Sequence, residues 1–305
     1  MKKIALALDL GGTNLRLAAV GEDGAVYSRS RAATPTQSSS GEIVDLIVRL
    51  ADECRREAPA GTDVFAIGAA APASIDQAAG VLTQLPNLPA LDGLSLRDIL
   101  SQRLGVPAIL ENDATAAALG ENWRGASRNL DDSICVTLGT GVGGGLIING
   151  QPFRGKDGTA GEVGHICVEA EGLPCGCGGR GCVEQYASAT AIVRMANEAG
   201  LDVRSSRDVY DAAIAGDANA IAVFDRMGSY LGIGLSSLIN VLNPEMIVIC
   251  GGVSAALELF IGSVNREVKV RAFSEPAMRA KIVRGELGDD AGILGAARAA
   301  FTHAA

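Results

Sequence analysis

The sequence predicts an α/β fold of two domains. Predicted strands alternate with predicted helices along the chain, which is typical of α/β architectures. The chain has 305 residues, near the upper limit for a single hydrophobic core. Two glycine-rich strand–turn–strand units, 6–20 and 136–148, each begin an α/β segment and indicate an internal duplication. We expect a small N-terminal α/β domain at 1–115 plus 291–305, and a large α/β domain at 116–290 that carries a metal-binding loop.

The expected elements of the first half follow from apolar runs, helical spacing and turn residues. Strands 15–20 and 25–29 flank a glycine-containing hairpin turn. The helix 42–56 has apolar residues at helical spacing. The complete expected order is strand 4–8, strand 15–20, strand 25–29, helix 42–56, strand 64–70, helix 94–104, strand 106–110 and helix 114–123.

The second half repeats this alternation after a second glycine tract. We expect strands at 133–138, 146–148, 246–250 and 281–283. The expected helices are 184–199, 206–215, 218–242, 255–271 and a closing helix at 291–301.

Composition and charge exclude several classes of protein. Hydrophobic residues make up 48% and charged residues 20%, which fits a folded globular chain. A net charge of −9 without a run of lysine or arginine argues against nucleic acid or an anionic membrane as partner. The N-terminal apolar run is short and interrupted by Asp9, so we expect a buried strand there and no signal peptide. No apolar segment reaches transmembrane length.

The first glycine turn combines a carboxylate, two glycines and a hydroxyl. Glycines allow backbone N–H groups to approach an anion closely, and the Thr13 hydroxyl could donate to a phosphate oxygen. Asp9 would repel phosphate and would act through Mg²⁺. The alternative is an ordinary hairpin turn. The candidate nucleotide-binding residues here are Asp9, Gly11, Gly12, Thr13 and Asn14.

The second tract, 139–145, has five glycines in seven residues. Such a tract costs backbone entropy that a plain hairpin would avoid, and two facing turns could clamp a polyphosphate. Gly251 and Gly252 lie between a strand and a helix, at the kind of crevice that accepts nucleotides. Neither tract matches the Walker pattern. The candidate residues of the tract are Gly139, Thr140, Gly141, Gly143 and Gly144.

A histidine and three cysteines form a candidate metal site: His165, Cys175, Cys177 and Cys182. Three thiolates and one imidazole complete a tetrahedral zinc set with no open position, which is typical of structural zinc. A reduced metal-free loop and a disulfide are the alternatives, and the C-x-C-x4-C spacing with an upstream histidine disfavours both. Metal binding in a reducing cytoplasm explains seven cysteines better than disulfides do.

The other cysteines and the second histidine carry no motif. Cys54, Cys135, Cys167 and Cys250 lie in apolar segments, so we expect all four in the core. His303 has no partner pattern, and we expect it to be exposed.

Glu111, Asn112 and Asp113 lie between a predicted strand and a predicted helix. Asn and Asp are preferred N-caps, so either could be purely structural. Alternatively, Asp113 could be a general base that accepts the proton of an acceptor hydroxyl during phosphoryl transfer. The residues alone leave both interpretations open.

Several motifs together resemble the repressor–ORF–kinase (ROK) family of sugar kinases. They are DLGGTNLR, ENDATAAALGE, LGTGVGGGLIINGQPFRG, AGEVGH, CGCGGRGCVEQYAS, NPEMIVICGGVS and GDDAGILGAA, in the family's order from residue 4 to about 301. The resemblance implies the actin-like, hexokinase-like ATPase fold of two α/β domains with a cleft between them. Family repressors carry a DNA-binding helix-turn-helix before the first glycine turn. This sequence begins eight residues before Asp9, so we expect the kinase branch, and CVEQYAS most resembles bacterial glucokinases.

The resemblance also assigns roles to residues. It makes Asp113 the catalytic base and places Mg-ATP between the glycine tracts, with adenosine near Gly251 and Gly252. It implies that His165 binds zinc through one ring nitrogen and the sugar through the other, and that the protein is a homodimer or homotetramer. The sugar-binding residues it implies are Gly68, Asn87, Asn112, Asp113, Glu162, His165 and Glu184.

The sequence departs from the family pattern at three places, and the first two, in the sugar-facing loops, bear on sugar preference more than on reaction type. Ala73 follows Pro72 where a glycine is frequent, Leu91 replaces a frequent tryptophan, and 111–115 reads ENDAT in place of ENDAN. A glucokinase is the first expectation, and an N-acetylmannosamine, N-acetylglucosamine, allose or fructose kinase is the alternative. Two other classes remain: a sugar-binding regulator, disfavoured by the two glycine tracts, and a zinc-ribbon nucleic-acid module, disfavoured by the acidic charge and the absence of paired CxxC knuckles.

Overall fold

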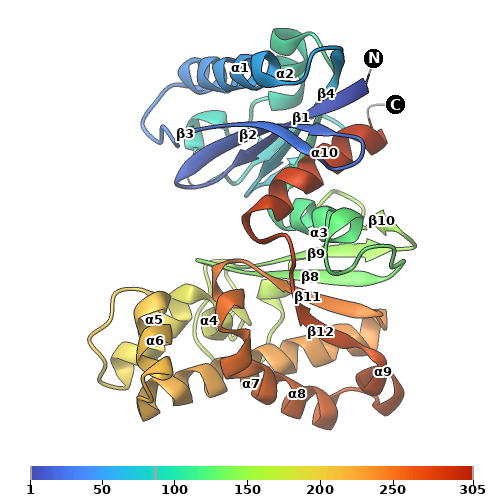
Figure 1. Cartoon of the computed structure of the whole chain (residues 1–305). Coiled ribbons are helices and arrows are strands. Elements are labelled where there is room, and N and C mark those ends of the chain that lie inside the picture. Colours follow the sequence, from blue (N-terminus) through green and yellow to red (C-terminus); the bar gives the residue numbers. More distant parts are fainter. Residues whose placement is uncertain (1, 86–87, 304–305) are drawn as a thin grey trace.

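The computed structural model describes residues 2–85 and 88–303. Two five-stranded sheets lie one above the other, and two helices, α3 (Asp113–Arg124) and α10 (Ala291–His303), lie between them (Figure 1). Further helices cover the outer side of each sheet, so the molecule is built in layers. This alternation of strand and helix confirms the predicted α/β class.

The first sheet has the order β3-β2-β1-β4-β7. β1 is antiparallel to β2 and parallel to β4, and β4 is parallel to β7. Its strands are β1 (Lys2–Leu10), β2 (Asn14–Gly21), β3 (Val26–Ala33), β4 (Thr62–Ala71) and β7 (Ala108–Asn112).

The alternation of residue size along β1 explains how this sheet is covered. Ile4, Leu6 and Leu8 pack in the core with helices α1 (Ser40–Glu57) and α2 (Leu96–Leu104). Ala5 and Ala7 point to the other face and pack against α10. Successive strand residues face opposite sides, so large residues fill the outer core and small ones let α10 approach closely.

The second sheet has the order β10-β9-β8-β11-β12. Its strands are β8 (Ser133–Leu138), β9 (Val142–Ile148), β10 (Gln151–Pro152), β11 (Met246–Cys250) and β12 (Lys281–Arg284). Ile134 and Val136 face the outer helices, whereas Cys135 lies on the α3 side with Val248. The outer helices are α4 (Glu184–Ala187), α5 (Ala189–Glu198), α6 (Ser206–Ile214), α7 (Ala218–Leu242), α8 (Leu257–Arg271) and α9 (Ser274–Arg279).

The chain crosses between the two sheets twice. It leaves α3 through 125–132 to enter β8, and it returns from β12 through 285–290 to α10. α3 packs against α10 and also against β8 and β9. The predicted division after residue 115 therefore falls inside a helix that contacts both sheets, and the domain bounds stay a prediction.

Several short elements were not expected from the sequence. Short segments contain too few residues to show the hydrophobic periodicity by which a helix or strand is recognised. They are the hairpin β5 (Ser74–Asp76) and β6 (Val81–Thr83), strand β10, helix α9, and the 3-10 turns η1 (Pro89–Leu91), η2 (Val163–His165), η3 (Gly252–Ala256) and η4 (Gly288–Asp290).

Three expectations need correction. The helix expected at 184–199 is divided at Ser188, whose hydroxyl caps α5 by accepting from Ala191 N at 3.1 Å. Residues 143–145 belong to strand β9 and not to a turn. Cys54, Cys135 and Cys250 are buried as expected, whereas Cys167 is exposed. Cys167 lies in a loop outside both cores, where its backbone forms an isolated β-bridge with that of Cys182.

His303 is exposed as expected, but it has a neighbour: its Nε2 lies 3.3 Å from Arg154 Nη2. Within the described ranges, no helix has the length and apolar character needed to cross a bilayer.

Candidate functional site

A cavity of about 680 Å³ opens between the two sheets. It brings together the two glycine turns, the start of α3, the end of β11 and the start of the cysteine loop, the segment 162–183 that holds the four candidate metal ligands. Its lining residues are Asp9, Leu10, Gly11, Gly12, Thr13, Pro72, Ala73, Ser74, Gln84, Asn112, Asp113, Thr137, Gly139, Thr140, Gly141, Val142, Gly143, Glu162, His165, Glu184 and Gly251. Most candidate site residues named from the sequence therefore share one cleft, although they come from segments far apart in the chain.

Asn112 is the N-cap of α3. Its Oδ1 accepts from the backbone N–H of Ala114 at 3.0 Å and of Thr115 at 3.2 Å, which satisfies amides that a helix start leaves free. Its Nδ2 donates to the carbonyl of Ala73 at 3.3 Å. The structural interpretation of Asn112 is thus correct, and one Nδ2 hydrogen remains for a ligand.

Asp113, the first residue of α3, lies at the floor of the cleft. Its Oδ1 accepts from Ala114 N at 2.8 Å, which fixes the carboxyl group at the helix start. The side chain is open to the cleft and surrounded by protein on its other sides, and this desolvation raises its pKa. The negative charges of Asp9 and Glu162 raise the pKa further. Such a carboxyl group is a stronger proton acceptor than a free aspartate.

Asp9, at the end of β1, is 8% exposed and pairs with Arg16. The two are register partners across the β1–β2 hairpin, so the pairing follows from the strand geometry. Both guanidinium contacts end on Oδ2, which leaves Oδ1 without a partner in the described residues. Burial raises the pKa of Asp9, Arg16 lowers it and the charge of Asp289 raises it again, and the net result is a pKa above the usual value. Sequence reasoning missed Arg16, although the hairpin register could have indicated it.

Glu184, at the start of α4, braces the second glycine turn. Its Oε2 accepts from Val142 N at 3.0 Å. A Cβ at Gly141 would overlap that same carboxylate oxygen, so any larger residue would force the Glu184 carboxylate to shift. Ala189 N also donates to the Gly139 carbonyl at 2.8 Å, which ties the turn to α5.

The four candidate metal ligands come together as the sequence predicted. The donor atoms of His165, Cys175, Cys177 and Cys182 all lie within 4.8 Å of one another. His165 Nδ1 is 3.6 Å from Cys175 Sγ, and Cys177 Sγ is 3.7 Å from Cys182 Sγ. Zinc–sulfur bonds of about 2.3 Å in a tetrahedron separate sulfurs by roughly 3.8 Å, so the donor set fits zinc.

The other nitrogen of His165 faces away from the thiols. Nε2 lies 3.8 Å from Glu162 Oε2, on the cleft side. A metal bound at Nδ1 would therefore leave Nε2 as a donor next to the cleft.

Tyr186 holds the cysteine loop in place. Its hydroxyl accepts from Leu173 N at 2.9 Å, and its ring stacks on Tyr230 of α7 with centroids 4.1 Å apart. These contacts join the loop to the longest helix of the fold.

Comparison with known proteins identifies the family. The ROK family model matches residues 5–302. A glucokinase of Thermotoga maritima is 36% identical to this chain, covering 97% of both proteins. A glucokinase of Halalkalibacterium halodurans is 37% identical, covering 95% of this chain and 92% of that protein. The chain belongs to the ROK family.

Solved ROK structures support the same fold. A ROK family glucokinase from Streptomyces griseus, solved in complex with glucose and AMPPNP, is 35% identical, with a TM-score of 0.80. The alignment covers 96% of this chain and 98% of that one. The chain therefore has the actin-like, hexokinase-like ATPase fold, as the ROK resemblance implied.

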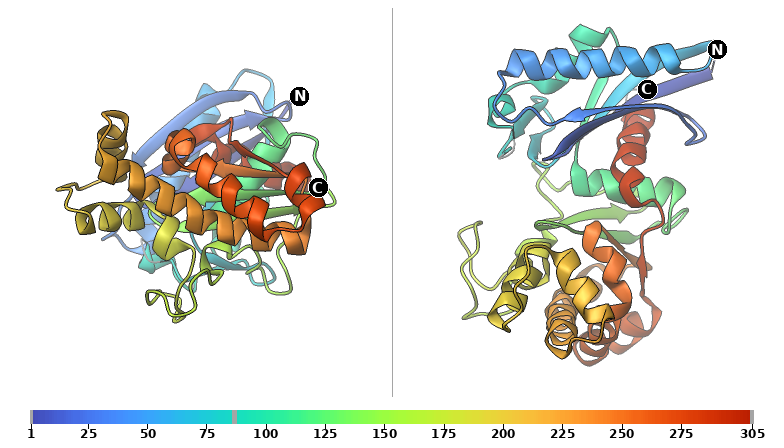
Figure 2. Two further views of the ribbon diagram at one scale, coloured as in Figure 1. Left: turned by 90° about the horizontal axis from the view of Figure 1, so that it is seen from below. Right: turned by 60° about the vertical axis from the view of Figure 1, so that its left-hand side comes forward.

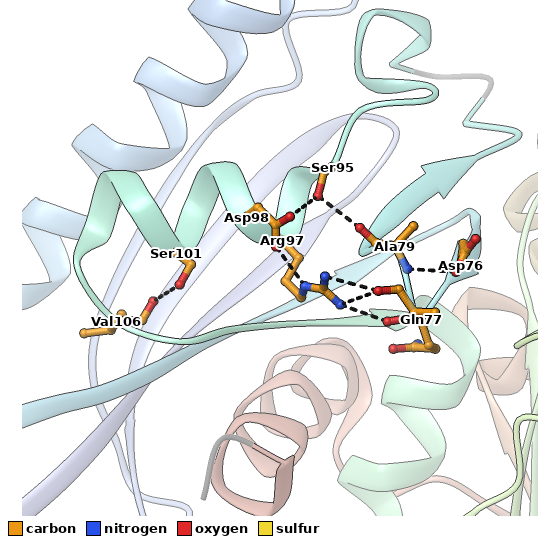
Figure 3. A network of polar contacts seen from close by, with 9 residues as sticks. Asp76, Gln77, Ala79, Ser95, Arg97, Asp98, Ser101 and Val106 are labelled. Atoms are coloured by element: carbon orange, nitrogen blue, oxygen red, sulfur yellow. Dashed lines mark hydrogen bonds and ion pairs between the residues drawn. The ribbon is translucent and has the colours of Figure 1, made fainter.

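Ser74, the first residue of the hairpin β5–β6, lines this ROK cleft, and the hairpin is tied to α2 (Figure 3). Arg97 donates to the carbonyls of Gln77 at 2.9 Å and Ala78 at 3.3 Å. Ser95 donates to the carbonyl of Ala79 at 3.1 Å, and Asp76 accepts from Ala79 N at 2.9 Å. These hydrogen bonds hold strand β5, whose first residue, Ser74, lines the cleft.

The sequence did not predict seven lining residues: Leu10, Pro72, Ala73, Ser74, Gln84, Thr137 and Val142. For Pro72, Ala73 and Ser74 the sequence did hold a signal, because the departure from the ROK pattern at Pro72 and Ala73 lies in a loop that the resemblance places next to the sugar. Gln84 and Thr137 belong to no motif and had no signal.

Some predicted site residues do not line the cleft. Gly68 is buried in β4, where a Cβ would overlap the Ala296 carbonyl of α10, so glycine is needed there for helix packing. Gly144 is buried in β9, and a Cβ would meet Val163 at 2.6 Å and the Gly161 carbonyl at 2.5 Å. Asn14 and Gly252 lie beside the cleft and outside its lining. Asn87 falls outside the described residues.

Proposed function

We propose that the chain is an ATP-dependent hexose kinase that converts glucose and ATP to glucose 6-phosphate and ADP. The observation that carries this proposal is the position of Asp113, a carboxyl group with raised pKa on the floor of a cleft between two glycine-rich turns. The similar ROK proteins with the printed name glucokinase support glucose as the hexose.

The sugar binds on the α3 and cysteine-loop side of the cleft. The carboxylates of Glu162 and Glu184 accept hydrogen bonds from sugar hydroxyls, and Asn112 and His165 donate through their remaining N–H groups. These groups hold the 6-hydroxyl next to Asp113. Asp113 accepts the hydroxyl proton while the oxygen attacks the γ-phosphorus, the new P–O bond forms, and the bond to the β-phosphate oxygen breaks, which releases ADP.

The phosphates lie between the two turns. Residues 11–13 and 140–141 line the cleft, and their backbone N–H groups would suit the oxygens of a polyphosphate, whereas the Gly139 N–H already donates to the Gly141 carbonyl at 3.0 Å. The free Oδ1 of Asp9 is a suitable Mg²⁺ ligand, because hard cations prefer carboxylate oxygens. Mg²⁺ supplies charge neutralisation of the phosphate oxygens when it is bound.

The adenosine lies beyond Gly251. A second cavity of about 230 Å³ adjoins Gly252 and is lined by Tyr210, Phe224 and Arg207. The Arg207 guanidinium is 5.2 Å from the centre of the Tyr210 ring, so a flat, partly apolar wall is available for a purine.

A structural zinc would be held by His165 Nδ1 and the thiolates of Cys175, Cys177 and Cys182. It would orient the loop that carries Glu162, and no step of proton or phosphoryl transfer passes through it. Metal analysis of purified protein tests this, with about one zinc per chain expected. A content far below that, or full activity of the double variant Cys175→Ser/Cys177→Ser, would reject the zinc site.

We also propose that the protein is cytoplasmic and forms a homodimer or homotetramer. Sedimentation of the purified protein measures the oligomeric state, and a monomer at micromolar concentration would contradict the proposed assembly.

A panel of hexoses tests the substrate. Coupled ADP-release assays should give the highest kcat/KM with glucose, ahead of N-acetylmannosamine, N-acetylglucosamine, allose and fructose. A different preferred sugar would correct the substrate and keep the reaction. Sugar binding without ADP release would instead identify a sugar-responsive regulator.

A further inference from the structure

Glu121 is a fully buried carboxylate that the proposed chemistry does not use. Its exposed fraction is 0%, and no lysine or arginine pairs with it in the described ranges 2–85 and 88–303. Buried charges without such a partner are rare and need hydrogen bonds from other groups. The partners of Glu121 are backbone amides alone, apart from the Cys250 thiol 3.9 Å away.

These amides belong to both segments in which the chain crosses between the sheets. Glu121 Oε2 accepts from Ala126 N at 2.8 Å, in the outgoing crossing after α3. The same oxygen accepts from Glu286 N at 3.2 Å, and Oε1 accepts from Leu287 N at 3.0 Å, both in the returning crossing before α10. One side chain therefore holds both connections, of which the returning one runs from β12 to α10 between the two sheets (Figures 1 and 2).

Glycines allow both crossings to come this close. A Cβ at Gly125 would overlap Glu121 Oε2, and a Cβ at Gly285 would lie 2.7 Å from Glu121 Oε1. The outgoing and returning segments are thus shaped around the carboxylate.

Glu121 shares helix α3 with Asp113. It lies eight residues further along the helix, or about 12 Å at 1.5 Å per residue. A helix transmits a displacement at one end to the other as a nearly rigid body. The position of α3 relative to the crossings therefore sets where Asp113 lies relative to the phosphate-facing turns.

We propose that Glu121 is a positioning residue that clamps both interdomain crossings to α3, so that closure of the cleft brings Asp113 into line with the phosphoryl donor. The kinetic part of this inference rests on the proposed kinase function. The clamp itself does not.

The variant Glu121→Gln tests the clamp. Gln keeps the size of the side chain but replaces one acceptor oxygen with an NH₂ donor, so either Leu287 N or the pair Ala126 N and Glu286 N loses its acceptor. Amide hydrogen exchange should become faster at Ala126 or at 286–287, because a bonded amide is released. The value of kcat for glucose phosphorylation should fall about tenfold, with the glucose KM changed less than about twofold, because residue couplings of this kind alter catalysis and leave the sugar contacts in place.

The matched control is Glu286→Gln. Glu286 is exposed, so this change removes a similar charge from the same crossing and keeps the backbone amide that Glu121 binds. Amide hydrogen exchange at Ala126 and 286–287, and the kcat for glucose phosphorylation, should be the same in Glu286→Gln as in the unmodified protein. The second variant, Gly125→Ala, displaces the Glu121 carboxylate without changing any charge and should reproduce the kinetic pattern of Glu121→Gln. It decides the question if Glu121→Gln does not fold.

Unchanged exchange, unchanged kcat, or an equal loss of kcat in Glu286→Gln would each overturn the proposal. A rise in KM with unchanged kcat would also overturn it, because that pattern places the effect in sugar binding. If the unmodified protein phosphorylates no hexose, the proposed function fails, and the exchange measurement still decides whether Glu121 clamps the crossings.

Discussion

Replacing Asp113 by Asn isolates the proton-accepting role. Asn retains an oxygen that can accept from Ala114 N at the 2.8 Å contact, so the start of α3 should stay intact. The change removes the basic group whose pKa is raised by desolvation in the cleft and by the charges of Asp9 and Glu162. Loss of a general base costs about 10²- to 10⁴-fold in rate, or roughly 3–5 kcal/mol of transition-state stabilisation.

Steady-state assays of ADP release, with glucose binding measured separately by calorimetry, test this prediction. The expected result is a fall in kcat within that range and a glucose dissociation constant changed by less than about tenfold. The matched control is Asp157→Asn, which makes the same chemical change on an exposed loop outside the cleft. A kcat for Asp113→Asn within threefold of the control would refute the assignment of Asp113 as base.

Three further predictions follow from neighbouring contacts. Gly141→Ala should lower kcat/KM by about 10²-fold, because the added methyl group displaces the Glu184 carboxylate; unchanged kinetics would contradict the bracing role. Glu162→Gln should move the acidic limb of the pH profile of kcat/KM to lower pH, because the Glu162 charge raises the pKa of the proposed base and that base acts only when ionised. A shift to higher pH would contradict this. Arg154→Met should lower the free energy of unfolding by about 3–5 kcal/mol at neutral pH, since it leaves the Glu111 carboxylate buried and unpaired. Burial already raises the pKa of Glu111 and Arg154 lowers it, so the loss should shrink as pH falls and Glu111 is protonated; a loss that grows toward acid pH would contradict the pairing.

The elements and residues predicted best from the sequence are those with a strong local signal. α7 and β8 have the predicted bounds, because a long apolar helix and a short apolar strand between turn residues are unambiguous. The donor atoms of His165 and the three cysteines meet because the spacing of these residues admits few other arrangements.

The sequence could not show what depends on packing between distant segments. Gly68 and Gly144 look like ligand-facing glycines in a motif, but their missing Cβ atoms make room for α10 and for the Gly161–Val163 turn. The partners of Glu121 are backbone amides, which every residue carries, so no residue pattern identifies them. The short strands β5 and β6, of which Ser74 lines the cleft, are too brief to show a hydrophobic period.

The central claim is phosphoryl transfer from ATP to the 6-hydroxyl of glucose with Asp113 as the base. Phosphorus NMR of the protein with glucose, ATP and Mg²⁺ tests it most directly, because it identifies the product and its linkage. The account predicts glucose 6-phosphate and ADP in equal amounts, and almost none of either with Asp113→Asn under the same conditions. Phosphate release without a sugar phosphate, phosphorylation at another hydroxyl, or undiminished product formation by the variant would contradict it.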